Sequence, residues 1–204
     1  VYENVIAFAL ALQELGIVRG ENIALISDNR REWLITDLAI QSLGCADVPR
    51  GCDSLGNEIR FIISFADCRY GFFENGRQLK KVTEKIEDVP LLKTAILFDP
   101  LTKEEEELMA QYKDIKIYTF EELLKMGEAI YAKNPDEAQN KIEAEMELTQ
   151  PDDNATIIFT SGTTGTPKGV MLTHKNYTVQ LSAIHNFLTC KKGEWWMSIL
   201  PVWH

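Results

Sequence analysis

The chain has 204 residues, of which 45% are hydrophobic and 25% charged, a composition typical of a folded globular protein with a sizeable core. Disordered and fibrous proteins are excluded, and no apolar run approaches the roughly 18 residues that a membrane-spanning helix needs. The formal net charge is −10, from 31 acidic and 21 basic residues. This balance argues against nucleic acid as a partner, because phosphate backbones are bound by clustered Lys and Arg.

The predicted elements alternate along the chain between apolar, β-rich runs and amphipathic stretches. In chain order they are helix 1–15, strand 23–27, helices 31–43 and 55–66, strand 70–74, helix 78–86, strand 94–98, helix 102–112, strand 115–120, helix 121–133, strand 155–159 and helix 174–189. This order predicts an α/β fold, with helices packed on a mainly parallel sheet. No basic leader precedes the helical spacing that starts at Val1, so we expect the sequence to begin within a longer cytoplasmic chain rather than with a signal peptide.

Two acidic segments interrupt this pattern. Residues 134–153 contain seven acidic side chains against one basic residue, Lys141, and predict a solvated helix followed by an acidic connector. The run Glu104 to Glu107 resembles a cation site in composition only. Four adjacent carboxylates on a helix point in different directions, which favours a solvated surface over a metal site.

Cysteines and histidines form no metal-ligand pattern. The cysteines are Cys45, Cys52, Cys68 and Cys190, and the histidines are His174, His185 and His204. The absence of a C-x-x-C pair favours free thiols over a disulfide framework, and we assign no protein-bound transition metal. His174 follows a Leu-Thr pair at a predicted helix start, and we interpret it as structural.

Residues 160–169, Thr-Ser-Gly-Thr-Thr-Gly-Thr-Pro-Lys-Gly, directly follow the strand predicted at 155–159. Glycines let backbone N–H groups approach an anion, hydroxyls add donors and Lys168 supplies positive charge, so the composition suits a polyphosphate. The loop is not a Walker A motif, because Pro167 and Gly169 occupy positions where that motif needs Gly and Ser or Thr. It also lacks G-x-G-x-x-G, and Ser161 is not in a G-x-S-x-G elbow. Composition alone leaves a flexible Ser/Thr/Gly connection as the alternative.

Read in order, residues 159–170 resemble the phosphate-binding signature of the adenylate-forming enzymes: acyl-CoA synthetases, nonribosomal peptide adenylation domains and luciferases. Residues 200–204, Leu-Pro-Val-Trp-His, are similar to the L-P-x-x-H motif that follows in this family. Residues 47–51, followed by 54–66, are similar to the early strand and helix of the long-chain acyl-CoA and acyl-carrier-protein synthetases. The resemblance covers essentially the whole chain, but only the first part of the family's pattern.

The resemblance implies ATP-dependent activation of a carboxylic acid, with a long-chain fatty acid favoured, to an acyl-adenylate with release of pyrophosphate. Transfer to the thiol of CoA follows, so that ATP, Mg²⁺ and CoA are the implied cofactor and cosubstrates. The loop would hold the β- and γ-phosphates, Lys168 would offset charge on the departing pyrophosphate, and His204 would place the carboxylate. The implied nucleotide-binding residues are Thr160, Ser161, Gly162, Thr163, Thr164, Gly165, Thr166 and Lys168, and the implied catalytic residues are Lys168 and His204.

By the same resemblance, residues 1–204 form the first part of a large N-terminal domain, with an acidic connector at about 134–153 and a phosphate loop at 160–169. The remainder of that domain and a C-terminal domain would lie downstream, so we expect the 204-residue chain to be inactive alone. The alternatives are a nucleotide-binding module without catalysis, a P-loop phosphotransferase, and an adenylation enzyme for amino or aryl acids or for a carrier-protein acceptor. Peripheral membrane contact at the inner face stays open, and uncovered sheet edges favour self-association of the chain.

Overall fold

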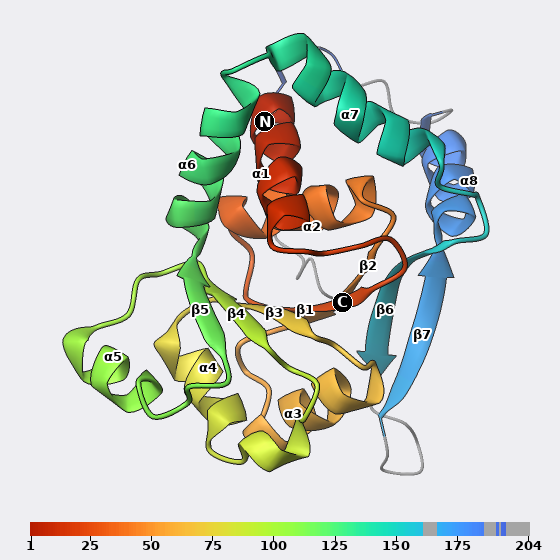
Figure 1. Cartoon of the computed structure of the whole chain (residues 1–204). Helices are drawn as coiled ribbons and strands as arrows, with labels where there is room; N and C mark the ends of the chain where they lie inside the picture. Colours follow the sequence, from red (N-terminus) through yellow and green to blue (C-terminus); the bar gives the residue numbers. More distant parts are fainter. Residues whose placement is uncertain (161–166, 186–190, 192, 195–204) are drawn as a thin grey trace.

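Seven strands form one sheet in the order β5-β4-β3-β1-β2-β6-β7, with helices on both of its faces (Figure 1). The computed structural model describes residues 1–160, 167–185, 191 and 193–194. The strands are β1 (Asn22–Ile26), β2 (Ala46–Arg50), β3 (Tyr70–Phe73), β4 (Thr94–Leu97), β5 (Lys116–Thr119), β6 (Asn154–Thr160) and β7 (Lys168–Thr173). Every neighbouring pair is parallel except β6 with β7. The predicted α/β fold with a mainly parallel sheet is confirmed.

The helices follow the predicted order, and their ends differ from the expected ones by a few residues. They are α1 (Tyr2–Glu14), α2 (Arg31–Ser42), α3 (Gly56–Phe65), α4 (Gly76–Thr83), the 3₁₀ helix η1 (Ile86–Asp88), α5 (Lys103–Met109), α6 (Phe120–Tyr131), α7 (Pro135–Glu147) and α8 (His174–His185). Among the described residues, no helix is long and apolar enough to cross a membrane.

Side chains that alternate along each strand divide between two hydrophobic cores. On β1, Ile23 and Leu25 join a core with α1, α2, α6 and α7, whereas Ala24 and Ile26 join a second core with α3, α4 and α5. We call these two sides of the sheet the α2 face and the α3 face. Burial on both faces is typical of parallel strands, and it explains why residues 23–26 of β1 are all apolar rather than alternating.

Two strands, β2 and β7, lie outside the pattern-based prediction. Strand β2 contains Asp47 and Pro49, two residue types that are depleted in strands. Pro49 is tolerated because the ladder between β2 and β6 has a single register pair, Asp47 with Thr156, and ends before it. Strand β7 begins inside the predicted phosphate loop. The glycines and proline of that loop indicate a turn, so the sequence pattern did not predict the strand that follows.

The acidic segment before β6 is less solvated than predicted. Its helix, α7, buries Ala138 and Ile142, which are four residues apart and therefore lie on one side of the helix. The Tyr2 hydroxyl on α1 donates to Glu143 Oε1 at 2.6 Å, and the Arg19 guanidinium pairs with Glu145 at 3.2 Å. Helix α7 thus packs against the α2 face, and two of its acidic residues contact other parts of the chain.

Candidate functional site

The predicted phosphate loop joins β6 to β7 at one end of an antiparallel hairpin (Figure 1). Thr160, the last residue of β6, is the cross-strand partner of Lys168, the first residue of β7, and both side chains are exposed. Because β6 is parallel to β2, the loop leaves the sheet at the edge formed by the carboxyl ends of the parallel strands. Ligands of open α/β sheets bind at this edge.

Arg50, at the end of β2, holds the root of the loop. Its Nη1 donates to the backbone oxygen of Phe159 at 3.1 Å, and its Nε donates to Ser54 Oγ at 2.9 Å. Hydrogen bonds from a guanidinium are charge-assisted and stronger than those between neutral groups. The carbonyl that precedes Thr160 is therefore tied to the neighbouring strand.

Packing on the α3 face also positions the two strands that flank the loop. Phe159 is buried, and its ring meets those of Phe61 and Phe65 edge-on, with centroids 6.4 Å and 5.9 Å away. A Cβ added at Gly169 would lie 3.0 Å from Ile157 Cγ2 and 3.2 Å from Phe159 Cζ, closer than ordinary contact. Gly169 thus favours the close packing of β7 on β6, a role separate from the one that its loop motif implies.

Hydrogen bonds connect three loops at the carboxyl edge of the sheet. These loops lie beside the boundary between β1 and β3, from which the chain connections run in opposite directions along the sheet. Glu74 Oε2 accepts from the Ser27 hydroxyl at 3.1 Å and from the Asp28 backbone N–H at 3.0 Å. The Asp28 carboxylate in turn accepts from the backbone N–H of Cys52 at 3.0 Å. These contacts hold the three loops together at the edge where ligands bind in such sheets.

Side-chain ligand atoms of Asp28, Cys52 and Glu74 lie within 4.8 Å of one another, a spacing that a metal ion could bridge. Burial raises the pKa of the Cys52 thiol to about 12, and the nearby carboxylates of Glu74 and Asp28 act in the same direction. The thiol is therefore protonated at neutral pH as long as no cation lies beside it. We interpret the three side chains as a structural connection between loops.

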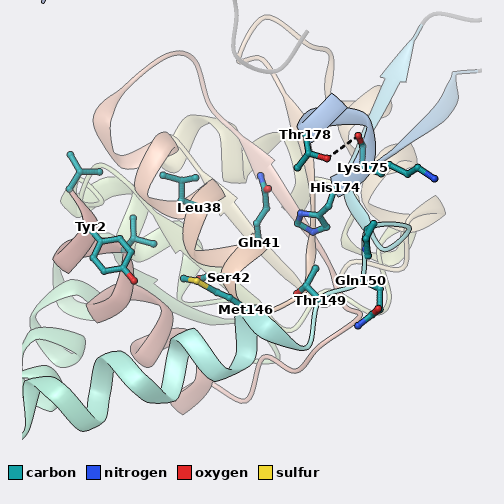
Figure 2. A pocket seen from close by; sticks show the side chains of 13 residues that line it. Tyr2, Leu38, Gln41, Ser42, Met146, Thr149, Gln150, His174, Lys175 and Thr178 are labelled. Carbon is teal, nitrogen blue, oxygen red and sulfur yellow. Dashed lines mark hydrogen bonds between the residues drawn. The ribbon is translucent and has the colours of Figure 1, made fainter. Parts of the chain in front are cut away.

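A cavity of about 710 Å³ lies at the opposite end of the β6–β7 hairpin (Figure 2). Its wall includes Tyr2 from α1, Gln41 from α2, Met146 from α7 and His174 from α8. Thr173, the residue before α8, is the cross-strand partner of Asn154 at the start of β6. The cavity therefore opens at the amino edge of the parallel strands, away from the loop at their carboxyl edge.

His174, interpreted from the sequence as structural, contributes a partly buried imidazole to this cavity. Burial lowers its pKa, which the carboxylate of Asp153 only partly opposes, so the neutral imidazole is favoured. Its Nε2 is buried without a hydrogen-bond partner among the described residues. The backbone N–H of His174 donates to the oxygen of Asp153 at 3.1 Å, which fixes the start of α8.

Of the predicted site residues, the structure describes Thr160 and Lys168 and brings them together across the hairpin. Residues 161–166, which contain Ser161, Gly162, Thr163, Thr164, Gly165 and Thr166, lie outside the described residues, as does His204. The phosphate-binding and catalytic roles assigned to these residues stay predictions. Arg50 lies within residues 47–51, whose resemblance to the family's early strand assigns it no role, because its contact with residue 159 depends on the order of strands in the sheet.

Comparison with known proteins assigns the family. The model of the AMP-binding enzyme family matches residues 1–204, the whole chain. The chain belongs to the AMP-binding enzyme family. The ligases of this family form adenylates, and the resemblance read from residues 159–170 is thereby confirmed.

Curated relatives within this family include fatty acid ligases. The chain is 33% identical to the probable acyl-activating enzyme 16 of Arabidopsis thaliana, over 99% of this chain and 27% of the relative. It is 32% identical to the chloroplastic long-chain-fatty-acid–[acyl-carrier-protein] ligase AEE15 of the same plant, with the same coverage, and 34% identical to fatty acyl-CoA synthetase B of Dictyostelium discoideum, over 95% of this chain and 27% of the relative. The chain therefore spans about a quarter of the length of these relatives.

Solved structures support the fold. A crystal structure of the anthranilate CoA ligase AuaEII in complex with anthranoyl-AMP superposes with a TM-score of 0.68 at 19% identity, covering 88% of this chain and 30% of that protein. The A-PCP didomain of a carboxylic acid reductase from Segniliparus rugosus, in complex with AMP, gives the same TM-score at 20% identity, over 87% of this chain and 25% of that one. At this identity the likeness supports the architecture of the sheet and its helices.

Proposed function

We propose that this chain is the part of an ATP-dependent carboxylate ligase that binds the nucleotide phosphates, and that the complete enzyme activates a long-chain fatty acid. The enzyme would join the carboxylate to the α-phosphate of ATP, release pyrophosphate and pass the acyl group to the thiol of CoA. Membership of the AMP-binding enzyme family and the fatty acid ligases among its relatives support this proposal.

The observation that carries the proposal is the place of the loop. Its two ends, Thr160 and Lys168, meet at the carboxyl edge of the sheet, and Arg50 secures its root from the adjacent strand. In this proposal Lys168 offsets negative charge that develops on the leaving pyrophosphate, an interaction that strengthens in the transition state. In this proposal Mg²⁺ would enter with the triphosphate, whose oxygens are the kind of ligand that this ion prefers.

The experiment is carboxylate-dependent exchange of labelled pyrophosphate into ATP by the full-length protein that carries this chain. Exchange with long fatty acids, and not with aryl or amino acids, is expected. Lys168→Ala should lower the exchange rate about 10²- to 10³-fold, the range found when one transition-state donor is removed. The matched control is Lys175→Ala, an exposed lysine at the other end of β7, which should exchange at the wild-type rate.

ATP binding, measured by equilibrium dialysis, separates the alternatives. If the protein binds ATP but catalyses no exchange with any acid, a nucleotide-binding module without ligase activity is the better interpretation. Exchange that Lys168→Ala leaves unchanged would remove Lys168 from the chemistry. The acceptor is tested in a separate assay, which measures thioester formation when CoA or a phosphopantetheinylated carrier protein is offered, because one curated relative is a carrier-protein ligase and others are CoA synthetases.

A further inference from the structure

The connection between β2 and α3, which we call loop 51–55, is held by a lysine from a neighbouring helix. The Lys81 ammonium, in the last turn of α4, donates to the backbone oxygen of Cys52 at 2.8 Å and to that of Ser54 at 2.9 Å. Such charge-assisted bonds are stronger than those between neutral groups. Among residues 1–160 and 167–185, no carboxylate forms an ion pair with Lys81, so its charge acts on the backbone of the loop.

The backbone at Lys81 is itself fixed by α3, which lies beside α4 (Figure 1). Arg60 on α3 is 8% exposed, and its Nη1 donates to the Lys81 oxygen at 2.5 Å while its Nε pairs with Asp88 at 2.9 Å. The first residue of α3, Gly56, allows this approach, because a Cβ there would lie 2.9 Å from the Lys81 oxygen and 3.0 Å from Arg60 Nη1. The ammonium thus extends toward loop 51–55 from a fixed backbone.

Ser54 connects this loop to the phosphate loop. It is buried, and its hydroxyl accepts from Arg50 Nε at 2.9 Å. The same guanidinium donates through Nη1 to the backbone oxygen of Phe159 at 3.1 Å. A continuous path of contacts therefore runs from the Lys81 ammonium through Ser54 to Arg50 and the root of the phosphate loop.

We propose that Lys81 is a positioning residue for nucleotide binding, a role that rests on the proposed function of the phosphate loop. Its ammonium holds the backbone of loop 51–55, and this places the Ser54 hydroxyl where it orients Arg50. A guanidinium that loses one of its two partners turns more freely, because a single bond does not fix the plane of its fork. The Phe159 oxygen is then held less firmly, and the phosphate loop is less well organised for ATP.

This role predicts an effect on nucleotide binding rather than on the chemical step. Lys81→Met removes the charge and keeps an apolar stem that packs as the lysine stem does. In pyrophosphate exchange by the full-length protein, the KM for ATP should rise about three- to tenfold, within the range by which members of one hydrogen-bond network affect each other. The kcat should stay within about twofold of wild type, because Lys168, the charge proposed to act in the transition state, is unchanged.

Lys80→Met is the matched control. Lys80 is exposed and shares the last turn of α4 with Lys81, so both charges interact with the same end of the helix dipole. This variant should keep the wild-type KM. An equal rise in KM in both variants would overturn the proposal, because it would assign the effect to the charge at the helix end rather than to the contact with loop 51–55.

Ser54→Ala tests the path itself. This variant removes the hydroxyl that Arg50 contacts and keeps the backbone oxygen that Lys81 contacts. It should raise the KM for ATP, and in its background Lys81→Met should change KM by less than about twofold. Fully additive effects of the two substitutions would contradict the path. If Lys81→Met fails to fold, a wild-type KM in Ser54→Ala alone would overturn the proposal.

Hydrogen–deuterium exchange of the full-length protein supplies a measurement that needs no catalysis. Lys81→Met should speed amide exchange in loop 51–55 and at Phe159 and leave β4 at the wild-type rate, whereas a global loss of stability would speed exchange throughout. Unchanged exchange at Phe159 would overturn the proposal.

The proposed function can fail separately. If the wild type binds ATP but catalyses no pyrophosphate exchange, the ligase is rejected, and the dissociation constant for ATP replaces KM in the same comparisons. A wild type that does not bind ATP would overturn both the ligase and the role of Lys81.

Discussion

Arg50 links two strands whose residues are far apart in sequence, and its effect on the loop can be measured separately from that of Lys168. Arg50→Ala removes the donors to the Phe159 oxygen and the Ser54 hydroxyl. Each charge-assisted bond contributes about 1.5 to 3 kcal/mol, so we expect pyrophosphate exchange to fall about tenfold or more. Most of the loss should appear as a raised KM for ATP, because a phosphate loop that is no longer held at residue 159 should bind the nucleotide more weakly.

The control for Arg50 is Arg77→Ala, an exposed arginine on α4 that should leave exchange unchanged. Arg50→Lys adds information because a lysine ammonium is a point charge without the planar fork of guanidinium. It should restore the charge without restoring both bonds. An Arg50→Lys variant with wild-type KM would show that the charge alone is needed, against the geometric role assigned to Arg50.

Helices α1 and α6 approach each other closely at Gly127, and a substitution at this residue tests that contact. A Cβ added at Gly127 would collide with the backbone oxygen of Ala7. In a helix that lacks such a contact, Gly→Ala stabilises by about 1 kcal/mol through helix propensity. Here the collision with rigid backbone should reverse the sign and lower the free energy of unfolding by about 1 to 3 kcal/mol.

Urea unfolding of Gly127→Ala, monitored by circular dichroism, measures this effect. Glu128→Ala, at the exposed neighbouring position on α6, is the control and should change stability by less than about 0.5 kcal/mol. A Gly127→Ala variant that is more stable than the wild type would mean that α1 and α6 are farther apart in solution than in this structure.

The same elements indicate how far sequence patterns reach. Helical and strand periodicity located α1 to α6, α8 and five of the strands, because apolar residues recur at regular spacing in them. Periodicity did not detect strand β2, because Asp47 and Pro49 break the apolar pattern. It also did not identify Ala138 and Ile142 of α7 as buried, because their neighbours in sequence are acidic. Thr160 and Lys168 could be selected from the order of a contiguous motif. Arg50 could not, because its contact requires β2 to lie beside β6.

Among the described residues, β7 and α8 expose several large apolar side chains. These exposed apolar residues are Val170, Met171, Val179, Leu181 and Ile184, each more than 40% exposed. Strand β7 is also an edge of the described sheet, with backbone groups available for pairing. We therefore expect the 204-residue chain by itself to self-associate, as exposed apolar surfaces of this kind do.

Size-exclusion chromatography with light scattering of the 204-residue chain checks this expectation. Met171→Lys/Leu181→Lys should shift the population toward the monomer, because two charges among the exposed apolar residues oppose the burial of these residues. Leu148→Lys is the control, since Leu148 is 61% exposed but lies at the end of α7, outside β7 and α8. A monomeric wild-type chain at high concentration would contradict the expectation.

The cross-strand pair of Thr160 and Lys168 has a consequence for evolution and engineering of the loop between them. When a folded strand pair already fixes both ends of a loop, doubling its length adds only about 0.6 kcal/mol of closure entropy. Inserting Gly-Ser after Gly165 should therefore leave Tm nearly unchanged, yet it should abolish pyrophosphate exchange by displacing the phosphate donors. In this proposal the ligand determines the length of the loop, whereas the fold itself would tolerate many other loop lengths.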